Sequence, residues 1–314
     1  MIKTKKCLSI LSLAVIGVLY GVSPASATPL LGSDLASFTV LGASTVTNIP
    51  TSTISGNVGV WSSGGANAIT GFNSSPGVAV ADSQVTGGQV HAGTAVAQSA
   101  QGQLTTAITN LGSLGPGTLL AADLVGLTLA PGVYTVPAGT TNLSGSLILD
   151  GLGNANAAWV FQMASTLFTS PNSVVNVINT GSGAGVFWNV GSSATIAVNT
   201  TFLGNILAQT SITMNTSATD VCGRALANTG AVTLAQNSLS GICTGVLAGS
   251  GGLNGGLDVT TTPGGGQDVV TMLPYAPING GGGGNGTVPE PDTLELLLIG
   301  LGFMGIGFSL RRRG

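Results

Sequence analysis

Glycines recur at a nearly constant interval in the second half of this chain, and this spacing restricts its fold more than any other feature. The intervals are 19, 19 and 18 residues, between Gly185, Gly204, Gly223 and Gly241. Between these glycines a short stretch of alternating small polar and apolar residues repeats, at 193–199, 211–215 and 231–235. A period near 20 residues is typical of solenoids, in which one unit buries its apolar face only by stacking on its neighbours.

The repeated stretches have the length and the flanking turn residues of β-strands. Similar stretches occur earlier in the chain, at 45–49, 140–143, 146–149 and 174–177. Charged residues make up only 5% of the chain, so the good helix formers Glu and Lys are scarce. We therefore predict a mainly β fold, a parallel β-helix, that occupies residues 28–245.

One segment follows a different period. Between residues 94 and 111 the apolar side chains recur at spacings of three and four, which places them on one face of a helix. They are Val96, Ala100, Leu104, Ala107, Ile108 and Leu111. Thr94 is a suitable N-cap and Gly112 a suitable stop, so we expect one long α-helix packed along the solenoid. A loop is the alternative, because Gly102 disfavours a helix by about 1 kcal/mol relative to alanine.

The N-terminal segment, residues 1–27, has the three parts of a secretory signal peptide. Three lysines precede an apolar run at 8–22, and the small residues Ala25, Ser26 and Ala27 form a cleavage site for signal peptidase. A transmembrane anchor is the alternative, although the run is short for one. Cleavage would leave Thr28 as the first residue.

The C-terminal segment, residues 288–314, resembles the PEP-CTERM sorting signal of Gram-negative bacteria. Pro-Glu-Pro at 289–291 precedes an apolar stretch at 294–310, and three arginines follow at 311–313. The stretch is just long enough to be a transmembrane helix, and the arginines would keep its end cytoplasmic. The resemblance implies export, transient anchoring in the inner membrane, cleavage by an exosortase, and delivery to the cell surface or the extracellular matrix. A plain membrane anchor is the alternative.

The segment before this signal, residues 246–287, is rich in Gly and Thr. Such a composition is typical of flexible linkers. We therefore expect a linker between the β-helix and the sorting signal.

The charged residues argue against several classes of function. Arg224 is the only Lys or Arg between the two terminal segments, and His91 is the only histidine. Nucleic-acid binding needs a basic patch, which this chain lacks. Catalysis and metal binding need clustered titratable groups, whereas the aspartates here are scattered. We therefore expect no enzyme, no metal site and no cofactor, and we disfavour the carbohydrate lyases and hydrolases that also use parallel β-helices.

Two cysteines remain after removal of the signal peptide, Cys222 and Cys243. An even number of cysteines in an exported protein favours a disulfide. We predict that they form one between neighbouring coils, with two buried free thiols as the alternative.

Several motifs together resemble the microbial ice-binding proteins that have a discontinuous β-solenoid. These motifs are FTVLG at 38–42, ISGNVGV at 54–60, ITGF at 69–72, LAPGVY at 129–134, WVFQ at 159–162 and GNILA at 204–208. The resemblance implies a right-handed β-helix of triangular section with a helix packed along it. It also implies that the N-terminal coil pairs out of sequence order with later coils, and that one flat face meets ice.

The residues themselves suggest which face this is. Residues i and i+2 of a strand point the same way, and strands of adjacent coils lie about 4.8 Å apart, so a Thr repeated in successive coils forms a grid of hydroxyls and methyls. The candidates are Thr140, Asn142, Asn176, Thr195, Ala197, Thr213, Asn215, Thr233 and Ala235. Thr45 and Thr47 are candidates to extend the grid, whereas Val174 interrupts it. A purely structural role is the alternative, because Thr is a good strand residue.

We therefore hypothesise a secreted or surface-displayed, non-enzymatic ice-binding protein that acts through a flat Thr-rich face. A structural or adhesive component of the extracellular polysaccharide matrix, without ice affinity, is the alternative. The expected partners are ice, signal peptidase and an exosortase, together with polysaccharide in the alternative.

Overall fold

A computed structural model describes residues 27–49, 51–62, 68–262 and 267–278. The predicted sorting signal and nearly all of the predicted signal peptide lie outside these residues. The chain divides into two units, Met1–Pro277 and Ile278–Gly314, and the description below concerns the first. Among the described residues, no helix is both long enough and apolar enough to cross a membrane; the apolar stretch at 294–310 is not among them.

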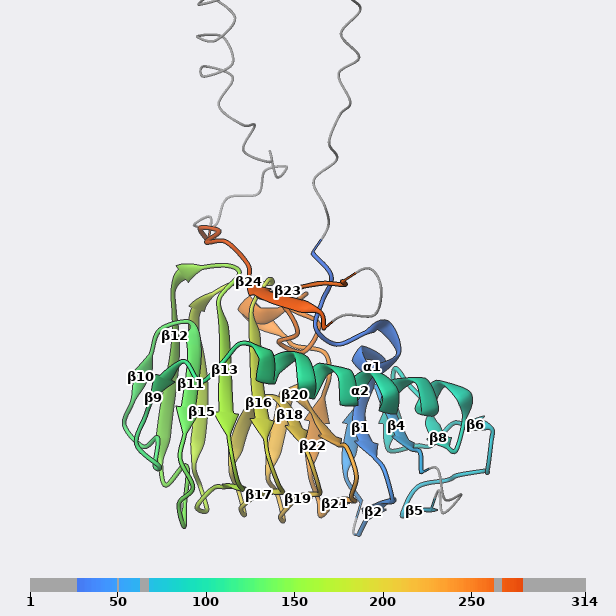
Figure 1. The fold of residues 1–314 in the computed structure, drawn as a ribbon. Coiled ribbons are helices and arrows are strands. Elements are labelled where there is room, and N and C mark those ends of the chain that lie inside the picture. Colours follow the sequence, from blue (N-terminus) through green and yellow to red (C-terminus); the bar gives the residue numbers. More distant parts are fainter. Residues whose placement is uncertain (1–26, 50, 63–67, 263–266, 279–314) are drawn as a thin grey trace, which may run out of the picture. The chain divides into compact units, whose positions relative to one another are not determined.

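The described part of the first unit is a parallel β-solenoid with three sides (Figure 1). We call the side that packs against the long helix the helix side. Its strands, in spatial order, are β6 (Ala79–Val80), β8 (Val90–Ala92), β4 (Asn57–Val60), β1 (Phe38–Gly42), β20 (Thr219–Ala227), β18 (Thr201–Ala208), β16 (Gly185–Val190), β13 (Ala158–Met163), β11 (Gly132–Val136) and β9 (Thr118–Leu119). These strands are parallel to their neighbours, apart from the antiparallel pair β6–β8.

A separate six-stranded sheet forms the second side, which we call the threonine side. Its strands, in spatial order, are β14 (Leu167–Phe168), β17 (Ala194–Ile196), β19 (Ile212–Met214), β21 (Val232–Leu234), β2 (Thr45–Asn48) and β5 (Ala68–Thr70). All of its strand pairs are parallel.

The third side is formed by β10, β12, β15, the first residues of β18 and β20, and then β22, β3 and β7. The bounds not yet given are β10 (Thr128–Leu129), β12 (Ser146–Asn154), β15 (Val174–Thr180), β22 (Ser238–Ser240), β3 (Thr53–Ser55) and β7 (Val85–Thr86). Strands β18 and β20 turn the corner between the third side and the helix side, which is why these two sides form one continuous sheet.

The coils do not stack in sequence order. Strand β1 pairs with β20, β2 with β21, and β3 with β22, so the N-terminal coil adds to the last coil of the chain. The next strands, β4, β5 and β7, complete that end of the stack. Helix α2 (Ala95–Ser113) then runs back along the helix side, and the chain resumes at β9 and β10 at the other end (Figure 1). The expected out-of-order pairing is therefore confirmed.

Helix α2 matches the predicted helix closely. The Thr94 side chain accepts a hydrogen bond from the Ala97 amide at 3.2 Å, as an N-cap does. The helix ends at Ser113, just beyond the expected stop at Gly112. Its buried face includes Ala100, Leu104 and Leu111 and packs on β1, β8, β13 and β16, whereas Val96 is exposed. The apolar spacing therefore identified the helix, although Val96 lies off the buried face.

Two of the recurring glycines are required by the backbone at one corner of the coils. Gly204 has a φ of 112°, a conformation that favours glycine. Gly223 stacks in register with Gly204, and a Cβ on Gly223 would lie only 2.1 Å from the Gly204 carbonyl oxygen. The interval of 19 residues is thus the length of one coil, measured between tight corners.

Large aromatic side chains fill the interior at one end of the solenoid. Phe161 and Trp188 stack with ring centroids 4.0 Å apart, and Tyr134 and Phe202 extend the row on either side. The Trp188 indole donates to the Leu203 carbonyl at 3.1 Å, so its polar atom is satisfied inside the core. This packing holds together the coils whose strands form the sides of the solenoid.

The chain beyond the last coil packs back onto the solenoid. It contains a 3-10 turn η1 (Gly245–Leu247) and an antiparallel hairpin of β23 (Leu257–Thr260) and β24 (Val269–Met272). Leu253, Leu257, Val259 and Val270 are buried. The structure therefore corrects the expected linker over 246–287, because 246–262 and 267–277 belong to the folded unit. The apolar residues here lack a periodic pattern that would have revealed these strands in the sequence.

The N-terminus and the two cysteines make further tertiary contacts in this region. Short helix α1 (Ser33–Ser37) contacts α2, and the Val259 amide donates to the Thr28 carbonyl at 3.0 Å. Cys222 and Cys243 form a disulfide that closes a loop with a sequence separation of 21. The disulfide joins β20 to the start of the C-terminal segment.

Candidate functional site

Threonines of five consecutive coils align on the threonine side. The strand registers pair them one with the next, in the spatial order Thr195, Thr213, Thr233, Thr47 and Thr70. We call this row the threonine column. At its β14 end, Phe168 pairs with Thr195 and takes the place of a sixth threonine. Because adjacent strands lie about 4.8 Å apart, the column is a regular row of methyl and hydroxyl groups.

Alternation along each strand separates the column from the core. The apolar neighbours Ile196, Met214 and Leu234 are at most 1% exposed, as expected for residues that point inward. The threonines themselves are exposed or half-buried. The predicted partners Asn215 and Ala235 are half-buried and Ala197 is buried, so Thr195, Thr213 and Thr233 are flanked by small side chains. Beside Thr47 the equivalent residue is Ile49, which is 62% exposed.

The column hydroxyls make no hydrogen bond with any residue that the structure describes. Buried or half-buried threonines elsewhere are used differently, since Thr39 donates to the Ser55 carbonyl and Thr180 to the Asn154 carbonyl. Beside the column, the Ser211 hydroxyl accepts from the Ala231 amide at 3.1 Å. The five column hydroxyls are therefore available to water.

No charged residue belongs to the strands of the threonine side. Arg224 and Asp220, on the continuous sheet, are 3% and 0% exposed. Arg224 donates to the carbonyls of Ala36, Gly251 and Gly252 and to the Asn205 side chain. The threonine side thus presents neither charges nor strongly hydrated groups.

The titratable groups that shift do so for local structural reasons. Burial lowers the pKa of His91, whose ring contacts Phe38 and the Thr94 hydroxyl. Hydrogen bonds from the Leu152 amide and the Asn179 side chain lower the pKa of the Asp150 carboxyl. No group of three or more His, Cys, Asp or Glu residues within the described ranges could hold a metal ion.

Of the predicted contact residues, Thr140 and Asn176 lie away from the column, and Asn142 is buried in line with its β14 end. Thr140 is in a bend outside the strands. Asn142 is buried, and its side chain accepts from the Phe168 amide and donates to the Ala122 carbonyl, so it bridges coils. Asn176 pairs with Ile148 on the third side. The T-x-N pattern is therefore not specific to one side of the solenoid.

The third side carries a hydroxyl row of its own, which is less regular. The registers align Ser146, Val174, Thr201, Thr219, Ser238 and Thr53. Val174 interrupts this row. The register between β18 and β20 also shifts shortly after the row, between Phe202 and Gly204. Val221 and Ile178 project nearby with exposed fractions of 44% and 40%. The row of threonines on the threonine side is therefore more regular than the hydroxyl row of the third side.

Sequence reasoning identified neither Thr70, a member of the column, nor Phe168, which lies in line with it. Thr70 lies in the second coil from the N-terminus, and only the out-of-order stacking brings it next to Thr47. Phe168 comes directly after Leu167 in a strand of two residues. The recognised copies Thr195, Thr213 and Thr233 are 18 and 20 residues apart, and no such interval links Thr70 or Phe168 to them.

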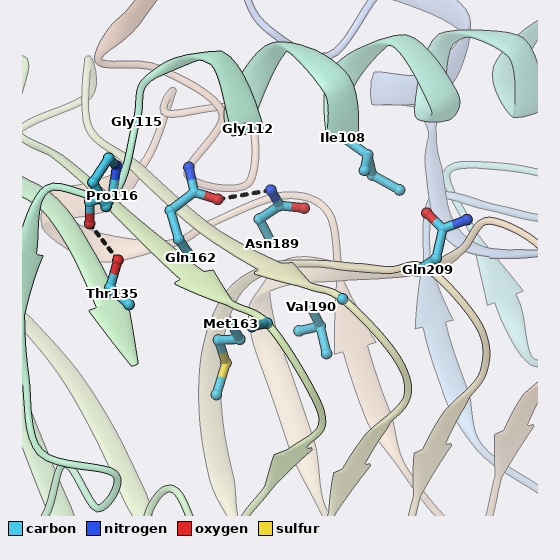
Figure 2. A pocket seen from close by; sticks show the side chains of 12 residues that line it. Ile108, Gly112, Gly115, Pro116, Thr135, Gln162, Met163, Asn189, Val190 and Gln209 are labelled. Atoms are coloured by element: carbon cyan, nitrogen blue, oxygen red, sulfur yellow. Dashed lines mark hydrogen bonds between the residues drawn. The ribbon is translucent and has the colours of Figure 1, made fainter. Parts of the chain in front are cut away.

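A groove of about 540 Å³ lies between the end of α2 and the helix side (Figure 2). Its polar side chains are used to hold the helix in place: Gln162 donates to the Leu111 carbonyl, and Asn189 donates to Gln162 at 2.8 Å. None of the residues that line the groove is titratable.

Comparisons with known proteins agree with this geometry. The family model described as ice-binding-like matches residues 40–240, and the PEP-CTERM protein-sorting motif matches residues 287–313. An ice-binding protein from Nostoc sp. (strain HG1) is 41% identical over 92% of this chain and 89% of its own length. One from Flammulina populicola is 31% identical over 71% of this chain and 93% of its own length.

A solved structure shows the same fold. The crystal structure of an ice binding protein from an Antarctic biological consortium matches with a TM-score of 0.57 and 30% identity, over 74% of this chain and 96% of that one. The resemblance found in the sequence motifs is therefore confirmed. The chain belongs to the ice-binding-like family and carries a PEP-CTERM sorting motif.

Proposed function

We propose that this chain is an exported, non-enzymatic protein that binds ice through its threonine side. The observation that carries the proposal is the threonine column, whose five hydroxyls are in register and make no hydrogen bond within the described protein. Methyls and hydroxyls at regular spacing hold water in a fixed pattern, and no nearby charge competes for that water. The ordered layer then joins the growing crystal.

The relatives support ice rather than another ligand. The curated relatives and the solved structure reported above are named as ice-binding proteins. A matrix component without ice affinity is not favoured by any of them, and no feature of the described surface points to polysaccharide.

The sorting motif supports export, and we infer the following route. Signal peptidase removes the N-terminal segment, the stretch at 294–310 anchors the chain transiently in the inner membrane, and an exosortase cleaves the C-terminal signal. The product, approximately residues 28–287, reaches the cell surface or the extracellular matrix.

A substitution in the middle of the column tests the proposal. Thr213→Tyr places a ring above the row between Thr195 and Thr233, which prevents close approach of a flat crystal. We expect the concentration needed to inhibit ice recrystallisation in frozen sucrose to rise at least about tenfold, equivalent to about 1.4 kcal/mol of binding. Circular dichroism should stay unchanged, because the side chain projects outward.

The matched control is Thr201→Tyr, which adds the same ring to an exposed position of the third side. It is expected to keep full activity. If Thr201→Tyr loses activity while Thr213→Tyr keeps it, the third side meets ice. If purified residues 28–287 leave grain growth as in buffer, ice binding itself is refuted.

A further inference from the structure

Phe168 occupies a position on the threonine side that a threonine would otherwise fill. Its Cα partner in the sheet is Thr195, the first member of the column. The preceding residue, Leu167, is buried, so Phe168 points outward as the column threonines do, and it is 40% exposed. The large ring therefore lies in line with the row of small methyl and hydroxyl groups.

The coil beyond Phe168 does not continue the row. In that coil the neighbour of Phe168 is Asn142, whose backbone N–H donates to the Phe168 carbonyl. Asn142 is fully buried and uses its side chain between coils. The hydroxyl row thus ends at Thr195, and the ring of Phe168 stands at its edge.

We propose that Phe168 sets the extent of the ice-binding surface and limits its activity. This inference rests on the proposed function. A phenylalanine ring is longer than a threonine side chain, so it rises above the plane of the column and keeps a flat crystal away from Thr195. It also lacks the hydroxyl that would order water at the sixth position.

The fold does not need a phenylalanine at this position. The hydrogen bonds of this residue with Asn142 come from its backbone, and any residue other than proline retains them. Threonine is β-branched and suits a strand. Phe168→Thr should therefore lengthen the column from five threonines to six without changing the fold.

The experiment compares Phe168→Thr with the unsubstituted chain, both as residues 28–287, in ice recrystallisation and thermal hysteresis assays. Phe168→Thr is expected to lower the inhibitory concentration about twofold or more, equivalent to about 0.4 kcal/mol. Phe168→Val has the shape of threonine without the hydroxyl, so it should give a smaller gain. An unchanged or weakened activity in both variants, with melting temperatures like that of the parent, overturns the inference.

Ile178→Thr is the matched control, because Ile178 is also 40% exposed but lies on the third side in β15. It replaces an equally exposed apolar side chain by threonine and is expected to leave activity unchanged. An equal gain from Ile178→Thr would mean that surface polarity, rather than the column, is responsible, and would also overturn the inference.

The double variant Phe168→Thr/Thr213→Tyr separates this inference from the proposed function. If the threonine side binds ice, Thr213→Tyr abolishes activity in both backgrounds. If Thr213→Tyr retains activity, the threonine side is not the ice-binding site. If Thr213→Tyr is inactive but Phe168→Thr brings no gain, only the role of Phe168 is refuted.

Discussion

At the scale of single residues, the buried pair Asp220 and Arg224 stands out in a protein with so few charges. The five N–H groups of Arg224 bind carbonyls and an amide oxygen that belong to α1, the neighbouring coil and the C-terminal segment. Arg224 therefore joins three parts of the chain. The backbone amides of Cys222 and Gly204 lie near the Asp220 carboxylate, but neither of its oxygens has a hydrogen-bond partner of normal geometry among the described residues, so its charged form is poorly stabilised.

Because the buried Asp220 carboxylate is poorly stabilised, we predict an unusual dependence of the free energy of unfolding on pH. Burial raises the pKa of the Asp220 carboxyl well above 3.8, and the Cys222 amide and the Arg224 charge offset this only in part. A carboxyl whose pKa is raised by folding stabilises the protein below the unfolded pKa, and this contribution is lost as pH rises through the folded pKa. Asp220→Asn should remove the loss, with a slope of up to about 1.4 kcal/mol per pH unit.

Urea unfolding of the parent and of Asp220→Asn, from pH 4 upward, measures this difference. The variant is expected to gain relative stability as pH rises. Asp150→Asn is the control: because folding lowers the pKa of Asp150, the stability that its charge contributes is constant above about pH 4 and is lost only as pH falls below it. From pH 4 upward this variant should therefore differ from the parent by a constant offset. Parallel curves for the parent and Asp220→Asn would contradict the assignment.

At the scale of elements, the C-terminal segment is part of the fold. Leu253, Leu257, Val259 and Val270 are at most 8% exposed, and each such side chain contributes about 1.5–3 kcal/mol when fully buried. Cutting the chain after residue 245 should therefore cost several kcal/mol, a large part of the 5–15 kcal/mol that typical proteins have. Residues 28–245 are expected to melt far below residues 28–277, or to aggregate. Equal melting temperatures would show that the segment contributes nothing.

The disulfide acts on the same region. Cys222 and Cys243 are separated by 21 residues, and closing a loop of this size is worth about 3 kcal/mol through the unfolded state. The double variant Cys222→Ala/Cys243→Ala should lose about this much stability in urea, and dithiothreitol should destabilise the parent but not the variant. A reductant effect of equal size on both proteins would exclude the disulfide as its cause.

These elements also show how far the sequence could be interpreted. The repeat revealed Thr195, Thr213 and Thr233 because consecutive coils repeat along the chain. It could not place Thr70, because the stacking of N-terminal coils on C-terminal ones depends on tertiary packing. Asn176 was assigned to the wrong side, because alternation within a strand does not tell which of three sides the strand occupies. The hairpin at 257–272 was missed because its apolar residues are few and aperiodic.

At the scale of the whole molecule, the described charged residues lie outside the strands of the proposed ice-binding surface. Residues 28–287 contain one basic residue, Arg224, which is buried, and their other charged residues are aspartates. The described aspartates lie outside the strands of the threonine side. The surface that we assign to ice therefore contains no group that titrates, and its attraction for water comes from shape and hydroxyls.

This separation predicts that ice recrystallisation inhibition is insensitive to pH between about 5 and 9, where threonine, alanine and asparagine side chains do not ionise. It should also be insensitive to about 0.15 M salt, which screens charges beyond about 8 Å, once grain growth is compared with a buffer of the same composition. The measurement is the inhibitory concentration at each pH and salt level, with melting temperature recorded in parallel. A fall in activity across one pKa, with the fold intact, would require a titrating group at the ice contact and would exclude the threonine side as the whole binding surface.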